Sequence, residues 1–144
     1  MDYYIQALFG WQGRFNRLQY FGYTILSTVI ALLLIAITSS LFNVSDTTIS
    51  ILSVPGLSLV IFGYVYSSMA ITAKRLHDLG YGAINVLWIW LLNIAGNEID
   101  QLYPYPVIGI ILSILVLAVS VYLLAAPGVI GSNKYGDQPT GFKI

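Results

Sequence analysis

Cysteine is absent from this chain, and charged side chains are scarce, at 8% of its 144 residues. Without cysteine there is no disulfide, no thiolate zinc site and no cysteine nucleophile. A soluble globular domain carries about 25% charged residues, whereas 58% of this chain is hydrophobic and its mean hydropathy is +0.82. So few charges do not cover the surface of a soluble domain of this length. The composition therefore indicates a single membrane domain over residues 1–144.

Runs of like charge are also missing. The formal net charge is zero, and no more than two cations are adjacent, at Lys74 and Arg75. A nucleic-acid-binding surface needs a basic patch or stripe, so we expect no nucleic-acid partner. One histidine without cysteine makes a poor metal site, and we predict neither a metal nor any other cofactor.

Four apolar runs are candidates for membrane helices. The first, Phe21–Phe42, extends about 33 Å as a helix, more than the roughly 30 Å of a bilayer's hydrocarbon core. The third, residues 83–96, extends only about 21 Å and is short for a full crossing. We predict an all-α integral membrane fold, a four-helix transmembrane bundle with spans at residues 21–42, 49–73, 83–96 and 105–126.

Local signals predict the structure on either side of the spans. Asn16 and Gln19 have the spacing of a capping box, so we expect the first helix to begin at Arg17. The aromatic residues and glycines of residues 1–15 predict a short segment at the membrane surface, helical through about residue 8. The glycines and prolines of residues 127–144 predict a turn-rich tail.

The second apolar run contains its own helix-breaking and helix-ending residues. We assign residues 43–48 to a polar connection that precedes this run. Pro55 and Gly56 should kink or delay the helix. Gly80 should end it as a C′ residue.

The distribution of cations favours four crossings. With four, all six lysines and arginines fall on one side of the membrane: Arg14, Arg17, Lys74, Arg75, Lys134 and Lys143. The loops of the other side hold only acidic charges, Asp46, Glu98 and Asp100. The positive-inside rule makes the first side cytoplasmic. We therefore expect the N-terminus and the C-terminus to be cytoplasmic.

Three polar motifs lie on the side predicted to be cytoplasmic: GRFNRLQY at 13–20, RLHDLG at 75–80 and NKYGDQP at 133–139. In this order they resemble the motifs of the YhaH-like domain of unknown function, a family of small bacterial inner-membrane proteins. The resemblance implies a multi-pass protein of the bacterial inner (cytoplasmic) membrane and no particular activity. The chain departs from the family pattern after residue 80, where the family has paired tryptophans and this chain has Trp88 and Trp90 further on.

The polar residues of these motifs form the candidate site: Arg14, Arg17, Arg75, His77, Asp78, Asn133 and Tyr135. If their segment is helical, Arg14 and Arg17 share one face of it, and we expect them to contact lipid phosphates or a ligand. His77 and Asp78 suggest a proton-transfer or metal-binding pair, but adjacent helical side chains do not face each other. We therefore predict a structural or binding cluster and no catalytic residue.

Asp78 does not suit its position near the end of a helix. A carboxylate there opposes the helix dipole by about 0.3–1 kcal/mol, and exposed pairs with the cations one turn earlier would offset only about 0.3–0.5 kcal/mol. A guanidinium from another segment is a stronger and more directional partner. We predict an ion pair between Asp78 and Arg14 or Arg17, with the tail around Asn133 and Tyr135 closing over it.

An accessory or interaction subunit without enzymatic activity is the first of three functions compatible with the sequence. Residues 21–73 contain one charged residue, Asp46, whereas pumps and transporters usually place ionisable groups within the span. The partners would be the lipid bilayer and a larger membrane protein complex or further copies of the chain.

Two alternatives remain open. A small oligomeric transporter or channel would use Pro55 and Gly56 as a broken helix and Asn85 or Asn93 to line a path. An enzyme acting on lipid head groups at the cytoplasmic interface would use the motif at residues 75–80, with its adjacent histidine and aspartate.

Overall fold

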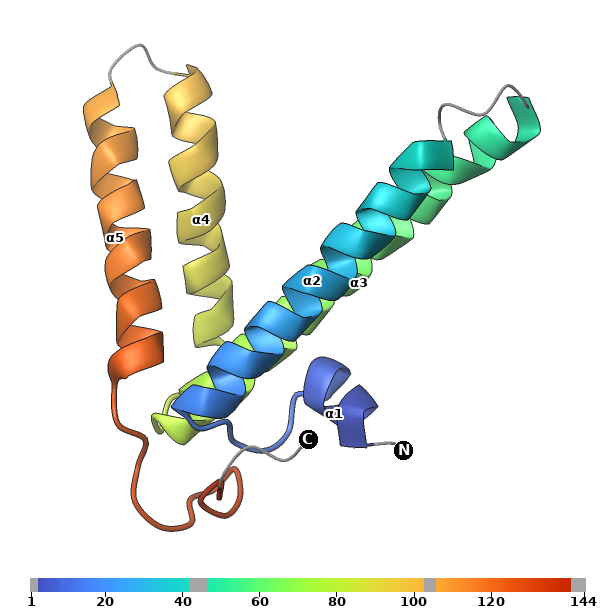
Figure 1. The fold of residues 1–144 in the computed structure, drawn as a ribbon. Coiled ribbons are helices and arrows are strands. Elements are labelled where there is room, and N and C mark those ends of the chain that lie inside the picture. Colours follow the sequence, from blue (N-terminus) through green and yellow to red (C-terminus); the bar gives the residue numbers. More distant parts are fainter. Residues whose placement is uncertain (1–2, 42–46, 103–105, 141–144) are drawn as a thin grey trace. The chain divides into compact units, whose positions relative to one another are not determined.

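The computed structural model describes residues 3–41, 47–102 and 106–140, which form five helices and the loops between them (Figure 1). The helices are α1 (Tyr3–Phe9), α2 (Arg17–Leu41), α3 (Thr47–Asp78), α4 (Asn85–Leu102) and α5 (Pro106–Ala125). In these ranges the only β-type pairing is an isolated bridge between Asn133 and Gly136. The prediction of an all-α chain is confirmed.

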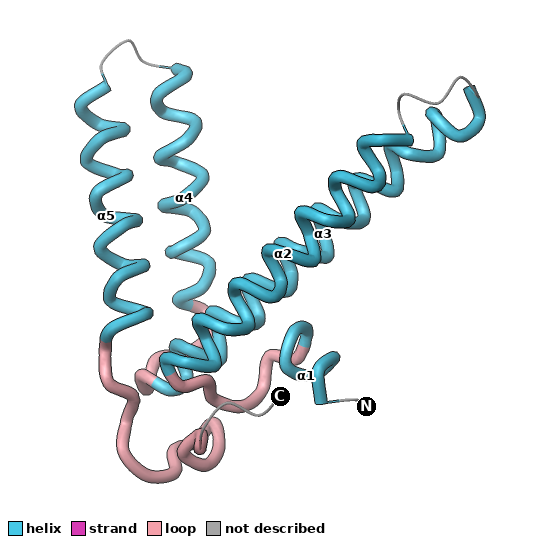
Figure 2. The backbone as a smooth tube through the Cα atoms, in the orientation of Figure 1, coloured by secondary structure: helices cyan, strands magenta, loops and turns pink. Residues whose placement is uncertain are grey.

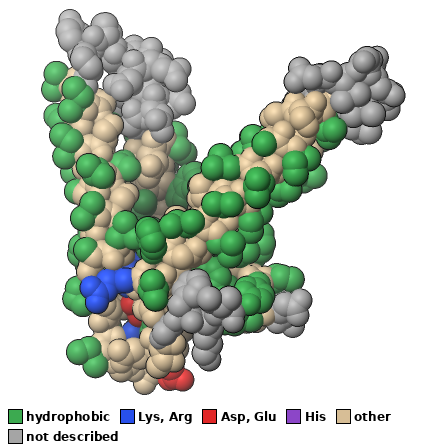
Figure 3. Space-filling view, viewed as in Figure 1, with side chains coloured by type: hydrophobic (Ala, Val, Ile, Leu, Met, Phe, Trp, Pro, Cys, Tyr) green, Lys and Arg blue, Asp and Glu red, His purple; other side chains and the backbone are tan. Residues whose placement is uncertain are grey.

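Three of the described helices are long and apolar enough to cross a membrane, over Arg17–Leu41, Ser53–Asp78 and Val107–Ala125. Only 11%, 17% and 11% of the respective apolar windows is buried inside the protein, and Figure 3 shows hydrophobic side chains over the outside of the helices. Such extensive exposed apolar surface needs lipid around it. The chain is a multi-pass membrane protein. The apolar part of α4, Asn85–Ala95, is shorter, so the fourth crossing stays a prediction.

The chain divides into two compact units. Unit 1 comprises residues 1–10 and 21–71, and unit 2 comprises residues 11–20 and 72–144. Unit 1 therefore holds α1 and most of α2 and α3, whereas unit 2 holds all three polar motifs together with α4 and α5. The single domain over residues 1–144 stays a prediction.

In unit 1, α1 packs on α3 and α3 packs on α2. The rings of Phe9 and Tyr66 are stacked with centroids 6.3 Å apart, and the hydroxyls of Thr28 and Tyr64 lie 3.3 Å apart. The helix expected through residue 8 is confirmed, since α1 ends at Phe9.

The first turn of α2 is a capping box, as predicted. The backbone N–H of Gln19 donates to Oδ1 of Asn16 at 2.8 Å, and the backbone N–H of Asn16 donates to Oε1 of Gln19 at 3.1 Å. These reciprocal bonds satisfy two N–H donors that a helix start leaves open. The helix begins at Arg17, and the predicted final residue, Phe42, lies outside the described residues.

Pro55 does not delay α3, and this part of the prediction was wrong. The helix begins at Thr47, eight residues before the proline, and continues through it to Asp78. A proline removes one N–H donor and crowds one preceding carbonyl, so a long apolar helix can accommodate it. Thr47 and Thr48 therefore belong to α3 and not to the polar connection, of which residues 43–46 lie outside the described ranges.

The end of α3 is the predicted glycine C-cap. Gly80 has φ +86°, a conformation that costs glycine little. The N–H of Tyr81 donates to the carbonyl of Leu76 at 2.8 Å, and the N–H of Gly80 donates to the carbonyl of His77 at 3.1 Å. These two bonds define a Schellman motif, which turns the chain at a fixed point just after Asp78.

α4 and α5 pack against each other within unit 2 (Figure 2). α4 runs to Leu102, past the predicted end at residue 96, because residues 97–102 contain no glycine or proline to stop it. α5 ends at Ala125, immediately before the predicted limit. The tail after α5 forms turns, with positive φ at Gly131 and Gly136.

Candidate functional site

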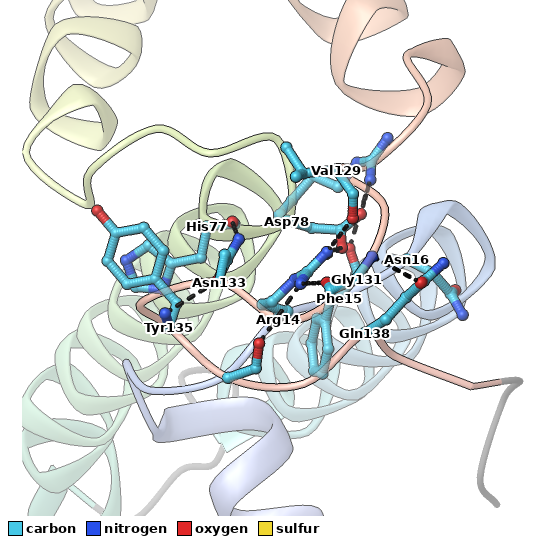
Figure 4. Close-up of polar contacts among 12 residues, drawn as sticks. Arg14, Phe15, Asn16, His77, Asp78, Val129, Gly131, Asn133, Tyr135 and Gln138 are labelled. Carbon is cyan, nitrogen blue, oxygen red and sulfur yellow. Dashed lines mark hydrogen bonds and ion pairs between the residues drawn. The ribbon is translucent and has the colours of Figure 1, made fainter.

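Asp78 lies at the centre of a buried ion-pair cluster in unit 2 (Figure 4). Nε and Nη2 of Arg14 lie 3.1 Å and 3.0 Å from its Oδ1. Nη1 of Arg75 lies 2.7 Å from its Oδ2. We call Arg14, Asp78 and Arg75 the triad. The predicted pairing of Asp78 with an arginine before α2 is confirmed for Arg14.

The triad is almost completely withdrawn from solvent. The exposed fractions of the side chains are 1% for Arg14, 4% for Asp78 and 0% for Arg75. The prediction that the local pair with Arg75 would be a weak, exposed one was therefore wrong. Removing one partner of a buried pair leaves the other charge without compensation, which costs far more than losing a surface pair.

Arg14 reaches the triad from a loop and not from a helix. It precedes α2 and comes directly after Gly13, which has φ +95°. Nη1 and Nη2 of Arg14 donate to the carbonyls of Gly131 and Val129, each at 2.5 Å. One guanidinium thus ties the loop before α2 to the end of α3 and to the tail.

Arg17 takes no part in the triad. It is exposed, and its Nη1 donates to the carbonyl of Ala125 at a long 3.4 Å. Arg14 and Arg17 do not share a helical face, because α2 begins at Arg17 and leaves Arg14 in the preceding loop.

Arg75 caps the C-terminal end of α5. Its Nε donates to the carbonyl of Leu123 at 2.6 Å, and its Nη2 donates to the carbonyl of Ala126 at 2.5 Å. The last carbonyls of a helix have no partner within the helix, so a side chain of α3 supplies donors to the end of α5. The sequence carries no signal for this contact, because 48 residues separate Arg75 from Leu123.

His77 faces a different set of partners from Asp78. Its Nδ1 lies 3.1 Å from the carbonyl of Gly13, and because a carbonyl only accepts, Nδ1 carries the proton. Its ring is stacked on that of Tyr135, with centroids 3.8 Å apart and planes 8° apart. Figure 4 shows the two rings face to face beside Asn133. The adjacent side chains His77 and Asp78 therefore do not act as a pair.

The tail closes over the end of α3, as predicted. Nδ2 of Asn133 donates to the carbonyl of His77 at 2.9 Å, and its Oδ1 accepts the backbone N–H of Tyr135 at 2.9 Å. The N–H of Val129 donates to the carbonyl of Asp78 at 2.8 Å. Asn133 and Tyr135 thus belong to the same polar assembly as the triad.

Two contacts of this assembly were not predicted from sequence. Lys74 is 2% exposed, and its Nζ lies 4.6 Å from the ring centroid of Phe15, within the range of a cation–π interaction. Gly128 passes so close to the Asp78 carboxylate that a Cβ atom added there would lie 2.6 Å from Cγ of Asp78. An aromatic residue next to an arginine, or a glycine after a proline, is too common a pattern to predict either contact.

The chemistry of the cluster is that of fixed charge and hydrogen bonding. Both carboxylate oxygens of Asp78 accept from guanidinium groups of the chain itself, which leaves the carboxylate poorly placed to contact a substrate. Within residues 3–41, 47–102 and 106–140, no three histidine or acidic side chains lie close enough together to hold a metal ion.

The fold and the cluster together define a small multi-pass membrane protein whose polar loops are joined by buried ion pairs. The chain belongs to the family described as protein of unknown function (DUF805), whose model matches residues 8–137. This range contains the first two polar motifs and most of the third. Neither the curated proteins nor the solved structures include one that matches the chain. The predicted membership of a family of unknown function is confirmed, and the YhaH-like name stays a prediction.

Proposed function

We propose that this chain is a non-enzymatic accessory or assembly subunit of the bacterial inner membrane, of the YhaH-like type, with the triad on the cytoplasmic side. The proposal rests on the acceptors to which the arginines of the triad donate their hydrogen bonds. The donors of Arg14 and Arg75 go to Asp78 and to backbone carbonyls of the loop before α2, of the end of α5 and of the tail. Such a cluster holds a polar surface in one shape. Its side chains have few donors or acceptors left for a substrate.

An enzyme that uses His77 and Asp78 has less support. His77 is 6% exposed, and its imidazole is stacked on Tyr135 and bonded to the carbonyl of Gly13. The carboxylate is held by two guanidinium groups. A general base needs to be within hydrogen-bond reach of the proton it abstracts, and both groups are already engaged with the chain itself.

A transporter or channel also has less support. The helix proposed to break at Pro55 and Gly56 is continuous. Nδ2 of Asn85 donates to the carbonyl of Gly82 at 3.0 Å, and Nδ2 of Asn93 donates to that of Ile89 at 2.9 Å. Both amides thus bond to backbone carbonyls three or four residues earlier in the chain.

Exposed apolar side chains in the loops of unit 2 favour an interaction role. Ile130 is 88% exposed in the tail, and Tyr81 is 48% exposed just after α3. Both lie outside the candidate spans. Apolar side chains held on a rigid polar surface suit contact with a larger membrane complex, with another copy of the chain or with the bilayer.

Purification of the full chain in mild detergent, followed by mass spectrometry, tests the accessory role. We expect a foreign membrane protein in stoichiometric amount, and we expect Ile130→Ser to reduce its recovery without changing the abundance of the chain. Self-assembly alone, together with ion flux in liposomes, would overturn the proposal in favour of a channel.

Alkaline-phosphatase fusions test the topology, because the enzyme is active only when exported. We expect activity for fusions after Asp46 and Asp100, and none for fusions after Asp78 and Asp137, since all the cations would then be cytoplasmic. An active fusion after Asp137 would mean that only the three long apolar helices cross and that the charge argument fails.

A further inference from the structure

The buried triad carries an excess of positive charge. It holds two guanidinium groups and one carboxylate, and the exposed fractions of all three side chains are 4% or less. In the described part of the chain, both of its ion pairs end on Asp78. The carbonyls that accept from Arg14 and Arg75 carry partial charges and do not supply the missing unit of negative charge. A buried charge without full compensation is costly, so the triad favours an anion nearby.

A polar cavity of about 210 Å³ adjoins this excess charge, and all of its lining lies in unit 2. Arg75 and Asp78 are among its lining residues, and so are the polar residues Arg17, Asn16 and Gln138. Since a water molecule takes up about 30 Å³ of liquid, the volume suits a small polyatomic anion with some of its hydration.

Arg17 gives the cavity a second, accessible cation. Its side chain is exposed, and its hydrogen bond to the carbonyl of Ala125 is long, at 3.4 Å. The guanidinium fork therefore has donors to offer to an incoming group. Planar guanidinium donors match the oxygen atoms of a phosphate in a bidentate manner.

We infer that this cavity binds a phosphate group, held by Arg17 and compensated by the positive charge of the triad behind it. The phosphate is that of a phospholipid head group or of a free phosphate anion. Arg17 is the first residue of a candidate membrane span, where head-group phosphates are abundant. The site requires no protein partner, so its test is independent of the accessory role proposed above.

The test uses the purified full-length chain in dodecyl maltoside, with the melting temperature followed by tryptophan fluorescence. One arm compares inorganic phosphate with chloride at equal ionic strength. The other compares micelles doped with phosphatidylglycerol and micelles doped with diacylglycerol, which lacks the phosphate. A phosphate ligand that binds only the folded chain raises the melting temperature, and the rise grows with the ratio of ligand concentration to its dissociation constant. Stabilisation by inorganic phosphate indicates a free anion, and stabilisation by phosphatidylglycerol alone indicates a head group.

Arg17→Gln is expected to weaken the affinity for the stabilising phosphate by about tenfold or more, the loss expected for a hydrogen bond to a charged group. Lys134→Gln makes the same change of charge at an exposed tail residue outside the cavity lining, and it should leave the affinity within about twofold.

Gln138→Glu provides a second, independent variant. It places a carboxylate in the cavity lining, so the response to phosphate should be lost. Gln12→Glu adds the same charge at an exposed residue away from the cavity and should retain the response. A wild-type chain that responds to neither form of phosphate would overturn the inference, as would equal responses of each variant and its control.

Discussion

Asp78→Asn is expected to lower the free energy of unfolding by about 3–5 kcal/mol, the cost of removing one partner from a buried ion pair. The substitution keeps the size of the side chain and removes its charge. Arg14 and Arg75, with exposed fractions of 1% and 0%, are then left without a counter-charge. An amide also offers one accepting oxygen where the carboxylate uses both, Oδ1 for Arg14 and Oδ2 for Arg75.

Unfolding by sodium dodecyl sulfate in mixed micelles, followed by tryptophan fluorescence, measures this loss. Asp137→Asn is the matched control, because it makes the same chemical change at an exposed tail residue, and it should stay within about 0.5 kcal/mol of wild type. Similar stabilities for the two variants would show that the ion pairs contribute little.

The partner of Asp78 can be identified in the same assay. Arg14→Gln should destabilise nearly as much as Asp78→Asn, because it also leaves the carbonyls of Gly131 and Val129 without their donor. Arg17→Gln should cost little, since it loses one long hydrogen bond.

In cells, Asp78→Arg should lower the abundance of the chain. Arg17→Asp should not restore it, whereas Arg14→Asp should restore a part.

Gly128→Ala is expected to destabilise the protein by about 1–3 kcal/mol, the usual cost of adding a methyl group where there is no space. The new Cβ would lie 2.6 Å from Cγ of Asp78. An aspartate on the surface would rotate away, but this carboxylate is held by Arg14 and Arg75. Any movement that relieves the overlap must lengthen those ion pairs.

Two controls separate this overlap from a general effect of alanine. Gly63→Ala adds the same methyl group within α3, where no atom beyond the adjoining helix backbone lies within 4 Å, and it should leave stability unchanged or slightly raised. In an Asp78→Ala background the carboxylate is gone, so Gly128→Ala should cost much less than in the wild-type chain. An equal cost in both backgrounds would mean that the overlap with Asp78 is not its cause.

Local sequence determined the class of the protein and most of its helix limits. Composition alone indicated a membrane protein, because apolar length and scarce charge do not depend on how the chain folds. The capping box at Asn16 and Gln19 and the glycine cap at Gly80 were predictable for a similar reason. Each involves residues at most five positions apart, so the motif contains both the donor and the acceptor.

Pro55 shows where local propensity was insufficient. Its effect on a helix depends on how much apolar helix surrounds it, and α3 extends well to both sides. The ion pair of Asp78 was predictable only as a choice between two arginines. A carboxylate that opposes the helix dipole needs a cation, but the sequence does not say which one the fold brings within reach.

Tertiary structure alone decided the choice of Arg14, the burial of the triad and the capping of α5 by Arg75. The contacts of Arg14 with Asp78 and of Arg75 with Leu123 join residues 64 and 48 positions apart, and no local pattern encodes such separations. The local pair of Asp78 with Arg75 was expected to contribute a few tenths of a kcal/mol to stability. Because burial withdraws both charges from water, each depends on the other for compensation, and the loss of the pair costs several kcal/mol. The sequence by itself thus determined where charge is placed along the chain, and the folded structure determined which charges meet and how much their contact is worth.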